Sequence, residues 1–66
     1  MKNKVKEYRM QLGLTQQEMA DKLCISRQSI FSIETGKYIP STTLALKMAK
    51  LFRKKVEEVF SLEEED

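Results

Sequence analysis

Residues 27–35 carry the side chains of this sequence that are best suited to hydrogen bonding with an external partner. On a helical wheel of about 100° per residue, Ile30 and Ile33 point to one side of this segment. The other side carries polar and aromatic residues, namely Arg27, Gln28, Phe31, Ser32 and Thr35. An arginine can bind guanine O6 and N7, a glutamine can bind adenine N6 and N7, and a phenylalanine can touch a thymine methyl group. This face therefore favours the recognition of base edges in a DNA groove.

We predict that Arg27, Gln28, Phe31 and Ser32 contact bases. The N-terminal residues of a helix in the major groove come nearest to the bases, so Arg27 and Gln28 are the leading candidates. Two alternatives stay open. Arg27 could contact phosphate alone, and Phe31 could fold sideways onto the preceding helix instead of facing DNA.

The charges of the chain are unevenly distributed, although its formal net charge is only +2. All 12 lysines and arginines lie within residues 1–56, a stretch that contains four acidic residues. The last ten residues contain six acidic residues and no basic one. A basic body favours a polyanion such as nucleic acid, although lysine-rich surfaces also occur on small domains without that function. The acidic tail indicates a solvated end that could repel the wrong surface.

Residue types that support other chemistry are scarce. The chain has no histidine and a single cysteine, so it can form no internal disulfide and lacks the ligands of a structural zinc site. The thin core of a 66-residue chain leaves little room for a buried acid–base pair, which argues against an enzyme. No apolar run approaches the ~18 residues of a membrane span, and no signal-peptide segment follows Met1. We expect one cytoplasmic domain over residues 1–66, without cofactor, metal, membrane association or an evident small-molecule effector.

Capping residues and glycines divide the chain into short helices and predict an all-α, compact five-helix bundle. The expected helices cover about residues 3–12, 15–23, 27–35, 42–53 and 56–60. Thr15 and Glu18 fit a capping box, and Ser26 and Ser41 are good N-caps. Residues 61–66 could form a terminal strand or a frayed tail.

Two spacings indicate how these helices pack. Val5, Tyr8 and Leu12 recur at helical spacing and predict the buried stripe of the first helix, which Gly13 ends. About three residues separate the second helix from the third. This is the length of the turn in a helix-turn-helix, where the two helices cross steeply.

The segment from Gln11 to Lys37 resembles the helix-turn-helix of lambdoid phage repressors and Cro proteins, and of the small bacterial and archaeal regulators called the XRE family. It has a glutamine-led helix (Gln16-Gln17-Glu18-Met19-Ala20), a short turn, a serine-capped helix and the exit Glu34-Thr35-Gly36-Lys37, in that order. Pro40-Ser41 and Val56-x-x-Val59-Phe60 fit as well. The resemblance covers residues 5–60 and implies a lambda repressor-like domain that binds operator DNA.

The resemblance also implies contacts with DNA phosphates. Gln16, beside Thr15, is similar to the family's phosphate-binding glutamine at the start of the second helix, where first-turn N–H groups and the helix dipole attract an anion. Lys37 and Tyr38 follow the third helix in the loop that the family lays on the DNA backbone. Two alternatives stay open here as well. Gln16 could be an ordinary solvated residue, and Tyr38 could pack on the bundle.

Three further residues have a structural expectation. In the resembled repressors, the positions of Arg9 and Glu34 form an ion pair between the first and third helices, and we expect the same pair here. The alternative is that Arg9 contacts phosphate. Cys24 stands where the family commonly has a glycine with positive φ, and a cysteine in that conformation costs about 1–2 kcal/mol. We interpret Cys24 as a small apolar turn residue, with redox sensing as the alternative.

Together these features predict a sequence-specific regulator of transcription, a repressor, that binds double-stranded operator DNA with helix 27–35 in the major groove. One alternative is the antitoxin of a toxin–antitoxin pair. Another is a protein-bridging module that keeps the fold, and an enzyme is the least supported class. The salt dependence of binding to duplex DNA would separate a DNA-binding protein from a protein-bridging module.

We also expect a homodimer, because the C-terminal part has more apolar residues than one small bundle can easily bury. The apolar residues of helix 42–53 span roughly 160° of the helical wheel, wider than the ~100° that a surface helix needs. The predicted interface consists of Leu51, Val56, Val59, Phe60 and Leu62. The alternative is a monomer that dimerises only on DNA.

Overall fold

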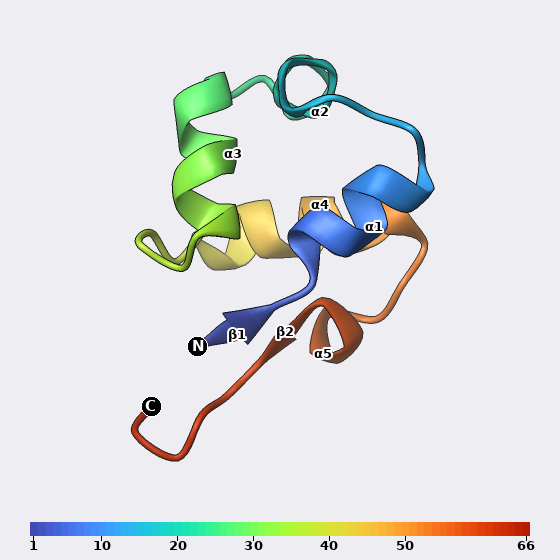
Figure 1. Cartoon of the computed structure of the whole chain (residues 1–66). Coiled ribbons are helices and arrows are strands. Elements are labelled where there is room, and N and C mark those ends of the chain that lie inside the picture. The colour runs from blue at the N-terminus through green and yellow to red at the C-terminus, as the bar shows by residue number, and fades with distance from the viewer.

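The computed structural model describes all 66 residues and contains five helices and two very short strands (Figure 1). In chain order they are β1 (Lys2–Asn3), α1 (Val5–Gln11), α2 (Gln16–Leu23), α3 (Arg27–Glu34), α4 (Thr42–Phe52), α5 (Val56–Val59) and β2 (Phe60–Ser61). The predicted five-helix, mainly α-helical fold is confirmed. The strands add a small sheet that the all-α prediction did not include, and α1 begins two residues later than predicted.

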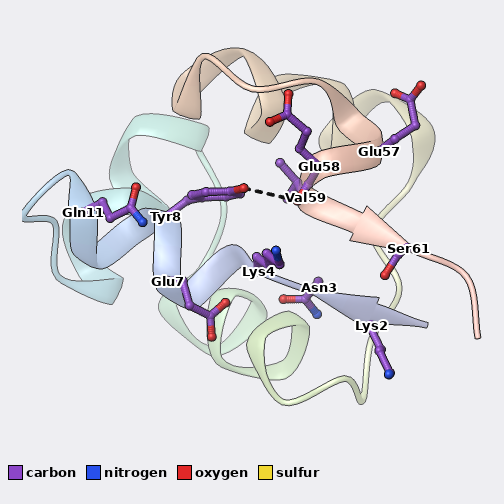
Figure 2. A pocket seen from close by; sticks show the side chains of 10 residues that line it. All are labelled: Lys2, Asn3, Lys4, Glu7, Tyr8, Gln11, Glu57, Glu58, Val59 and Ser61. Atoms are coloured by element: carbon purple, nitrogen blue, oxygen red, sulfur yellow. Dashed lines mark hydrogen bonds between the residues drawn. The ribbon is translucent and has the colours of Figure 1, made fainter.

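The two strands bring the beginning and the end of the described chain together. β1 and β2 pair antiparallel with Lys2 opposite Ser61 and Asn3 opposite Phe60. Next to them lies an open hollow of about 660 Å³ between α1 and α5, in which the Tyr8 hydroxyl donates to the Glu58 carbonyl at 3.4 Å (Figure 2). Lysines and glutamates of opposite charge line this hollow, and no residue of α2 or α3 contributes to it.

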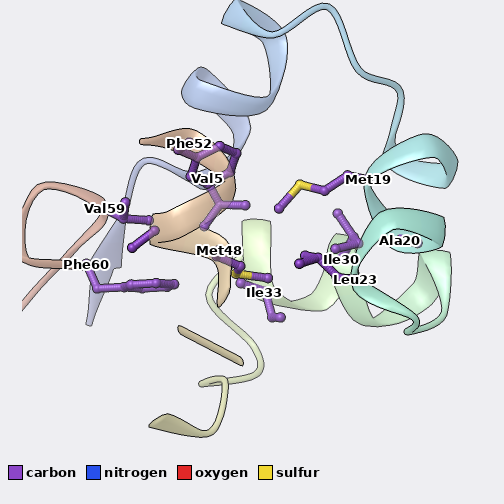
Figure 3. Packing of buried hydrophobic residues seen from close by; sticks show 11 residues of the cluster. Val5, Met19, Ala20, Leu23, Ile30, Ile33, Met48, Phe52, Val59 and Phe60 are labelled. Carbon is purple, nitrogen blue, oxygen red and sulfur yellow. The ribbon is translucent and has the colours of Figure 1, made fainter. Parts of the chain in front are cut away.

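The core is assembled from every helix and from the first residue of β2 (Figure 3). Its eleven residues are Val5, Met19, Ala20, Leu23, Ile30, Ile33, Met48, Ala49, Phe52, Val59 and Phe60. All eleven are apolar. The core therefore consists of close-packed apolar side chains, and the polar side chains that could bind a partner lie around it.

One sequence prediction about burial needs correction, whereas the predicted dimer interface stays a prediction. Leu12 is 47% exposed, because α1 ends at Gln11 and Gly13 turns the chain away with a φ of +70°. The buried face of α1 therefore reduces to Val5 and the half-buried Tyr8. Val59 and Phe60, predicted for a dimer interface, are 1% and 9% exposed because they complete the core of their own chain. They retain little surface for a partner.

The helices begin where the capping residues predicted. The Thr15 hydroxyl accepts the Glu18 backbone N–H at 3.0 Å, and the Glu18 carboxylate accepts the Thr15 N–H at 2.9 Å. Ser26 and Ser41 cap α3 and α4 by accepting the N–H groups of Ser29 and Leu44. These bonds satisfy donors that would otherwise lack partners at the helix starts, so they define the entry into each helix.

Candidate nucleic-acid interface

α2 and α3 form a compact unit joined by a turn at residues 24–26. In Figure 1, α2 is seen nearly end-on while α3 is seen from the side, so the two helices cross steeply. Cys24 has left-handed backbone angles, φ 57° and ψ 41°, as expected where the family commonly has glycine. The Ile25 N–H then donates to the Ala20 carbonyl at 3.0 Å and closes the turn. This tight connection holds the start of α3 against α2.

α3 presents two different faces. Ile30 and Ile33 are fully buried, whereas Arg27, Gln28 and Phe31 are exposed. Phe31 is 40% exposed, which is unusual for a large aromatic residue beside an apolar core. Ser32 is half-buried on the same outward side. The helical wheel therefore separated the core face of α3 from its outer face correctly.

The loop after α3 stays close to that helix. The backbone N–H groups of Lys37 and Tyr38 both donate to the Ser32 carbonyl, at 2.9 and 3.1 Å. Both side chains are exposed. Tyr38 also lines a shallow hollow of about 280 Å³ together with Gln28, Ser29 and Ser32. The structure thus places the predicted loop residues next to the outer face of α3.

The predicted ion pair between Arg9 and Glu34 is present. Arg9 Nε lies 2.6 Å from Glu34 Oε2, and the two side chains are 11% and 4% exposed. Arg9 also donates through Nη2 to Glu34 Oε1 at 3.4 Å and through Nη1 to the Leu14 carbonyl at 2.7 Å. No buried side-chain nitrogen or oxygen is left without a hydrogen-bond partner. The pair is therefore fully satisfied, which a buried charge requires.

Gln16 extends this ion pair to the surface, an arrangement that the sequence did not predict. Its Nε2 donates to Glu34 Oε1 at 3.1 Å, and its Oε1 accepts from Arg27 Nη1 at 3.4 Å. Arg27 and Gln16 are eleven residues apart, and Gln16 and Glu34 are eighteen apart. Contacts at such separations follow from the packing of α1, α2 and α3, so no local signal could have indicated them.

Other kinds of site find little support in the geometry. No three histidine, cysteine, aspartate or glutamate side chains gather where they could hold a metal ion. Cys24 is exposed and unpaired. None of the helices has both the length and the hydropathy that crossing a bilayer requires.

Two short helices joined by a tight turn, the second with an apolar inner face and a polar outer face, define a helix-turn-helix protein. The helix-turn-helix family model matches residues 5–59. The chain belongs to this family, in its XRE branch of DNA-binding transcriptional regulators.

Similar proteins come from both archaea and bacteria. A relative from Methanocaldococcus jannaschii is 52% identical and one from Bacillus subtilis is 48% identical, each over the full length of both chains. A relative from Archaeoglobus fulgidus is 39% identical over the whole chain and 93% of its own length. All three are named as uncharacterized HTH-type transcriptional regulators.

Proposed function

We propose that this protein represses transcription by binding double-stranded operator DNA with α3 in the major groove. The observation that carries the proposal is the outer face of α3, where Arg27, Gln28 and Phe31 are exposed while Ile30 and Ile33 hold the helix on the core. A bundle seated in a promoter excludes other proteins from the same groove. Repression therefore requires no activity beyond binding.

The proposed contacts divide into base readout and phosphate binding. Arg27 and Gln28, at the N-terminal end of α3, reach furthest toward the bases, and Phe31 and Ser32 follow one turn later. Phosphate contacts come from both ends of the unit, through Thr15 and Gln16 at the start of α2 and through Lys37 and Tyr38 after α3. The Thr15 hydroxyl oxygen accepts the Glu18 N–H and so caps α2, while its own O–H remains to donate to a phosphate.

Footprinting on the DNA that flanks the protein's own coding region tests the proposal. We expect a protected site whose occupancy falls steeply with added salt, because phosphate contacts release counterions. Binding to duplex DNA that is weak and independent of salt would contradict the proposal and favour a protein-bridging role. Repression itself is tested by placing the protected site in front of a reporter gene.

We further propose that the protein binds its operator as a homodimer, through a surface that differs in part from the predicted one. An apolar groove of about 300 Å³ lies between the loop after α3, α4 and the end of the chain. We call it the apolar groove, and its lining residues are Met1, Ile39, Pro40, Thr42, Ala45, Leu46, Val56 and Phe60. Val56, which is half-buried, and Phe60, of which only 9% is exposed, remain from the predicted interface. Leu51 lines a different hollow, beside Lys22 and Cys24.

Two observations favour a second copy of this chain as the occupant of the apolar groove. None of its lining residues has a charged side chain, and the N-terminal ammonium of Met1 is paired with Asp66. Ile39 and Leu46 are 60% and 54% exposed, so a second copy could cover them without burying a charged side chain. The molecule measures 32 × 22 × 20 Å between its Cα extremes. Two copies in contact along the longest axis would have centres about 32 Å apart, near the ~34 Å between operator half-sites one helical turn apart.

A further inference from the structure

A basic hollow lies between α2 and α4, on a part of the surface that the proposed function does not use. It has a volume of about 330 Å³. We call it the lysine hollow, and its lining residues are Lys22, Leu23, Cys24, Lys47, Lys50 and Leu51. No residue of α3 lines it, and neither does any of the proposed DNA contacts. This hollow therefore requires a separate explanation.

The lysine hollow combines three positive charges with two leucines. The leucines lie deeper than the lysines, because Leu23 is 9% exposed and Leu51 is half-buried, whereas all three lysines are exposed. No acidic residue lines the hollow, and none of the lysines belongs to an ion pair of the structure. A fitting partner therefore carries several carboxylates next to one apolar side chain. Nucleic-acid phosphates would match the lysines but not the leucines.

The acidic segment Leu62–Asp66 has this composition. Leu62 is 78% exposed, and the four acidic residues that follow it are exposed as well. The chain has seven large apolar residues that are exposed, namely Met10, Leu12, Phe31, Tyr38, Ile39, Leu46 and Leu62. Among them, Leu62 alone has an acidic neighbour in the sequence. The chain thus contains one segment that matches the chemistry of the lysine hollow.

The acidic segment is already folded into a turn. The Glu63 N–H donates to Asp66 Oδ2 at 2.9 Å, and the Asp66 N–H donates to the Glu63 carbonyl at 3.1 Å. Asp66 also pairs with the Met1 ammonium at 3.1 Å, whereas Glu64 and Glu65 take part in none of these contacts. A preformed turn loses less conformational freedom when it binds.

The same contacts keep the acidic segment away from the lysine hollow of its own chain. Figure 1 shows the segment beyond the small sheet, on the opposite side of the molecule from α2. A segment that reaches the hollow therefore comes from another molecule.

We propose that the lysine hollow binds the acidic segment Leu62–Asp66 of a second copy of this chain. Leu62 packs against the two leucines, and the carboxylates of Glu64 and Glu65 face the lysines. The hollow and the segment are different surfaces, so the contact is heterologous, unlike a twofold contact through the apolar groove. It therefore joins one homodimer to the next, and it couples the binding of neighbouring dimers to adjacent DNA sites.

Sedimentation of the protein without DNA, from micromolar to millimolar concentration, tests the proposal. At low salt we expect species larger than a dimer, in amounts that rise with protein concentration. These species should disappear near 1 M salt, where the Debye length falls to about 3 Å. A dimer through the apolar groove should persist there, because that groove has no charged side chain. Absence of larger species at millimolar concentration and low salt would overturn the proposal.

Two charge-reversal variants locate the contact. Lys47→Glu with Lys50→Glu changes the hollow, and Glu64→Lys with Glu65→Lys changes the segment. Each variant alone should associate about tenfold more weakly than the wild type at low salt. An equimolar mixture of the two should recover the larger species, because each variant supplies the half that the other lacks. Unchanged association in either variant, or a mixture that recovers nothing, would overturn the proposal.

Lys4→Glu with Lys6→Glu is the matched control. Both lysines are exposed and lie outside the hollow, and their reversal changes the net charge by the same amount. This variant should associate like the wild type, and an equal loss would assign the association to net charge and overturn the proposal.

A duplex DNA titration separates the other occupant and the proposed function. Weaker binding of DNA by the hollow variant, together with unchanged self-association, would make the hollow a nucleic-acid surface and overturn the proposal. Because the association is measured without DNA, its failure leaves operator binding intact. Failure of the footprinting experiment, in turn, leaves the association intact.

Discussion

The outer face of α3 and the apolar groove are both exposed, but they are built from opposite chemistry. Behind the face of α3 lies a chain of polar side chains that ends in the nearly buried carboxylate of Glu34. No residue that lines the apolar groove has a charged side chain, and Ile39 and Leu46 are largely exposed there. Polar groups that are held in place suit recognition of one partner sequence, whereas an uncharged surface suits association of two identical chains.

The comparison teaches that exposure alone does not indicate what a surface binds. Phe31 is less exposed than Ile39, yet its neighbours on the outer face of α3 are hydrogen-bonding residues, whereas Ile39 lies among mainly apolar ones. The two surfaces should therefore respond differently to substitution. Changes in the apolar groove should alter the oligomeric state, and changes on α3 should alter which sequence is bound.

The largest expected effect comes from introducing charge into the apolar groove. Ile39→Glu combined with Leu46→Glu should convert a dimer into a monomer, because each new carboxylate would have to be buried against the second copy. Loss of the paired half-site should lower operator affinity by about 10²–10⁴-fold. Sedimentation at micromolar concentration and a binding titration measure the two effects.

Leu62→Glu is the control for that experiment. Leu62 is 78% exposed and lies outside the apolar groove, although it belonged to the predicted interface. Its variant should remain dimeric. A wild-type protein that sediments as a monomer, or a double variant that remains a dimer, would exclude the apolar groove as the interface. Dimer loss in Leu62→Glu alone would restore the predicted C-terminal interface.

The next largest effect concerns the anchor behind α3. Glu34→Ala should lower the free energy of unfolding by about 3–5 kcal/mol, because it leaves the guanidinium of Arg9 nearly buried without its carboxylate. Denaturant unfolding of both single variants and the double variant gives the coupling between Arg9 and Glu34. Strictly additive losses would show that the contact contributes no coupling energy.

Arg27→Ala should affect recognition without affecting folding. We expect a loss of about 1–3 kcal/mol on the best operator and a relaxed preference at one base pair. The melting temperature should stay close to that of the wild type, because Arg27 is exposed and lies at the outer end of the polar chain. Lys47→Ala, which removes one positive charge from α4 outside the proposed interface, is the control for net charge. An equal change in selected sequence from both variants would refute the assignment.

Lys37→Ala should weaken binding to every sequence alike. One phosphate contact fewer should lower the slope of log affinity against log salt by about one, while the selected sequence stays the same. Titrations on the best and on a scrambled duplex at several salt concentrations measure both properties. A changed base preference would instead place Lys37 at a base edge.

The smallest effect concerns the capping box at the start of α2. The backbone N–H of Thr15 donates to the Glu18 carboxylate and lowers the pKa of that group. Because the pKa is lowered on folding, the ionised carboxylate stabilises the folded state at pH values above the ordinary glutamate pKa of about 4.3. This stability is lost as the pH falls further. Glu18→Gln keeps an acceptor but does not titrate. Its urea unfolding should therefore depend less on pH between about 5 and 3 than that of the wild type, and an identical pH dependence would contradict the prediction.

Much of the fold could be predicted because its signals are local. Thr15, Ser26 and Ser41 cap helices through bonds to residues three positions ahead, so their chemistry can be recognised in any linear sequence. The separation of Ile30 and Ile33 from the outer face of α3 follows from the helical period alone. The pair of Arg9 and Glu34 was predicted by resemblance to a family, not from local pattern.

Contacts between distant segments could not be predicted from the sequence pattern. The pairing of β1 with β2, the burial of Val59 and Phe60, and the bridge from Glu34 through Gln16 to Arg27 all join residues brought together by packing. Local hydrogen bonds and the helical period determined where the helices begin and which face of α3 is apolar. Tertiary packing alone decided which apolar residues of the C-terminal part stay exposed and which polar side chain contacts Arg27. Both outcomes depend on how the helices pack around one small core.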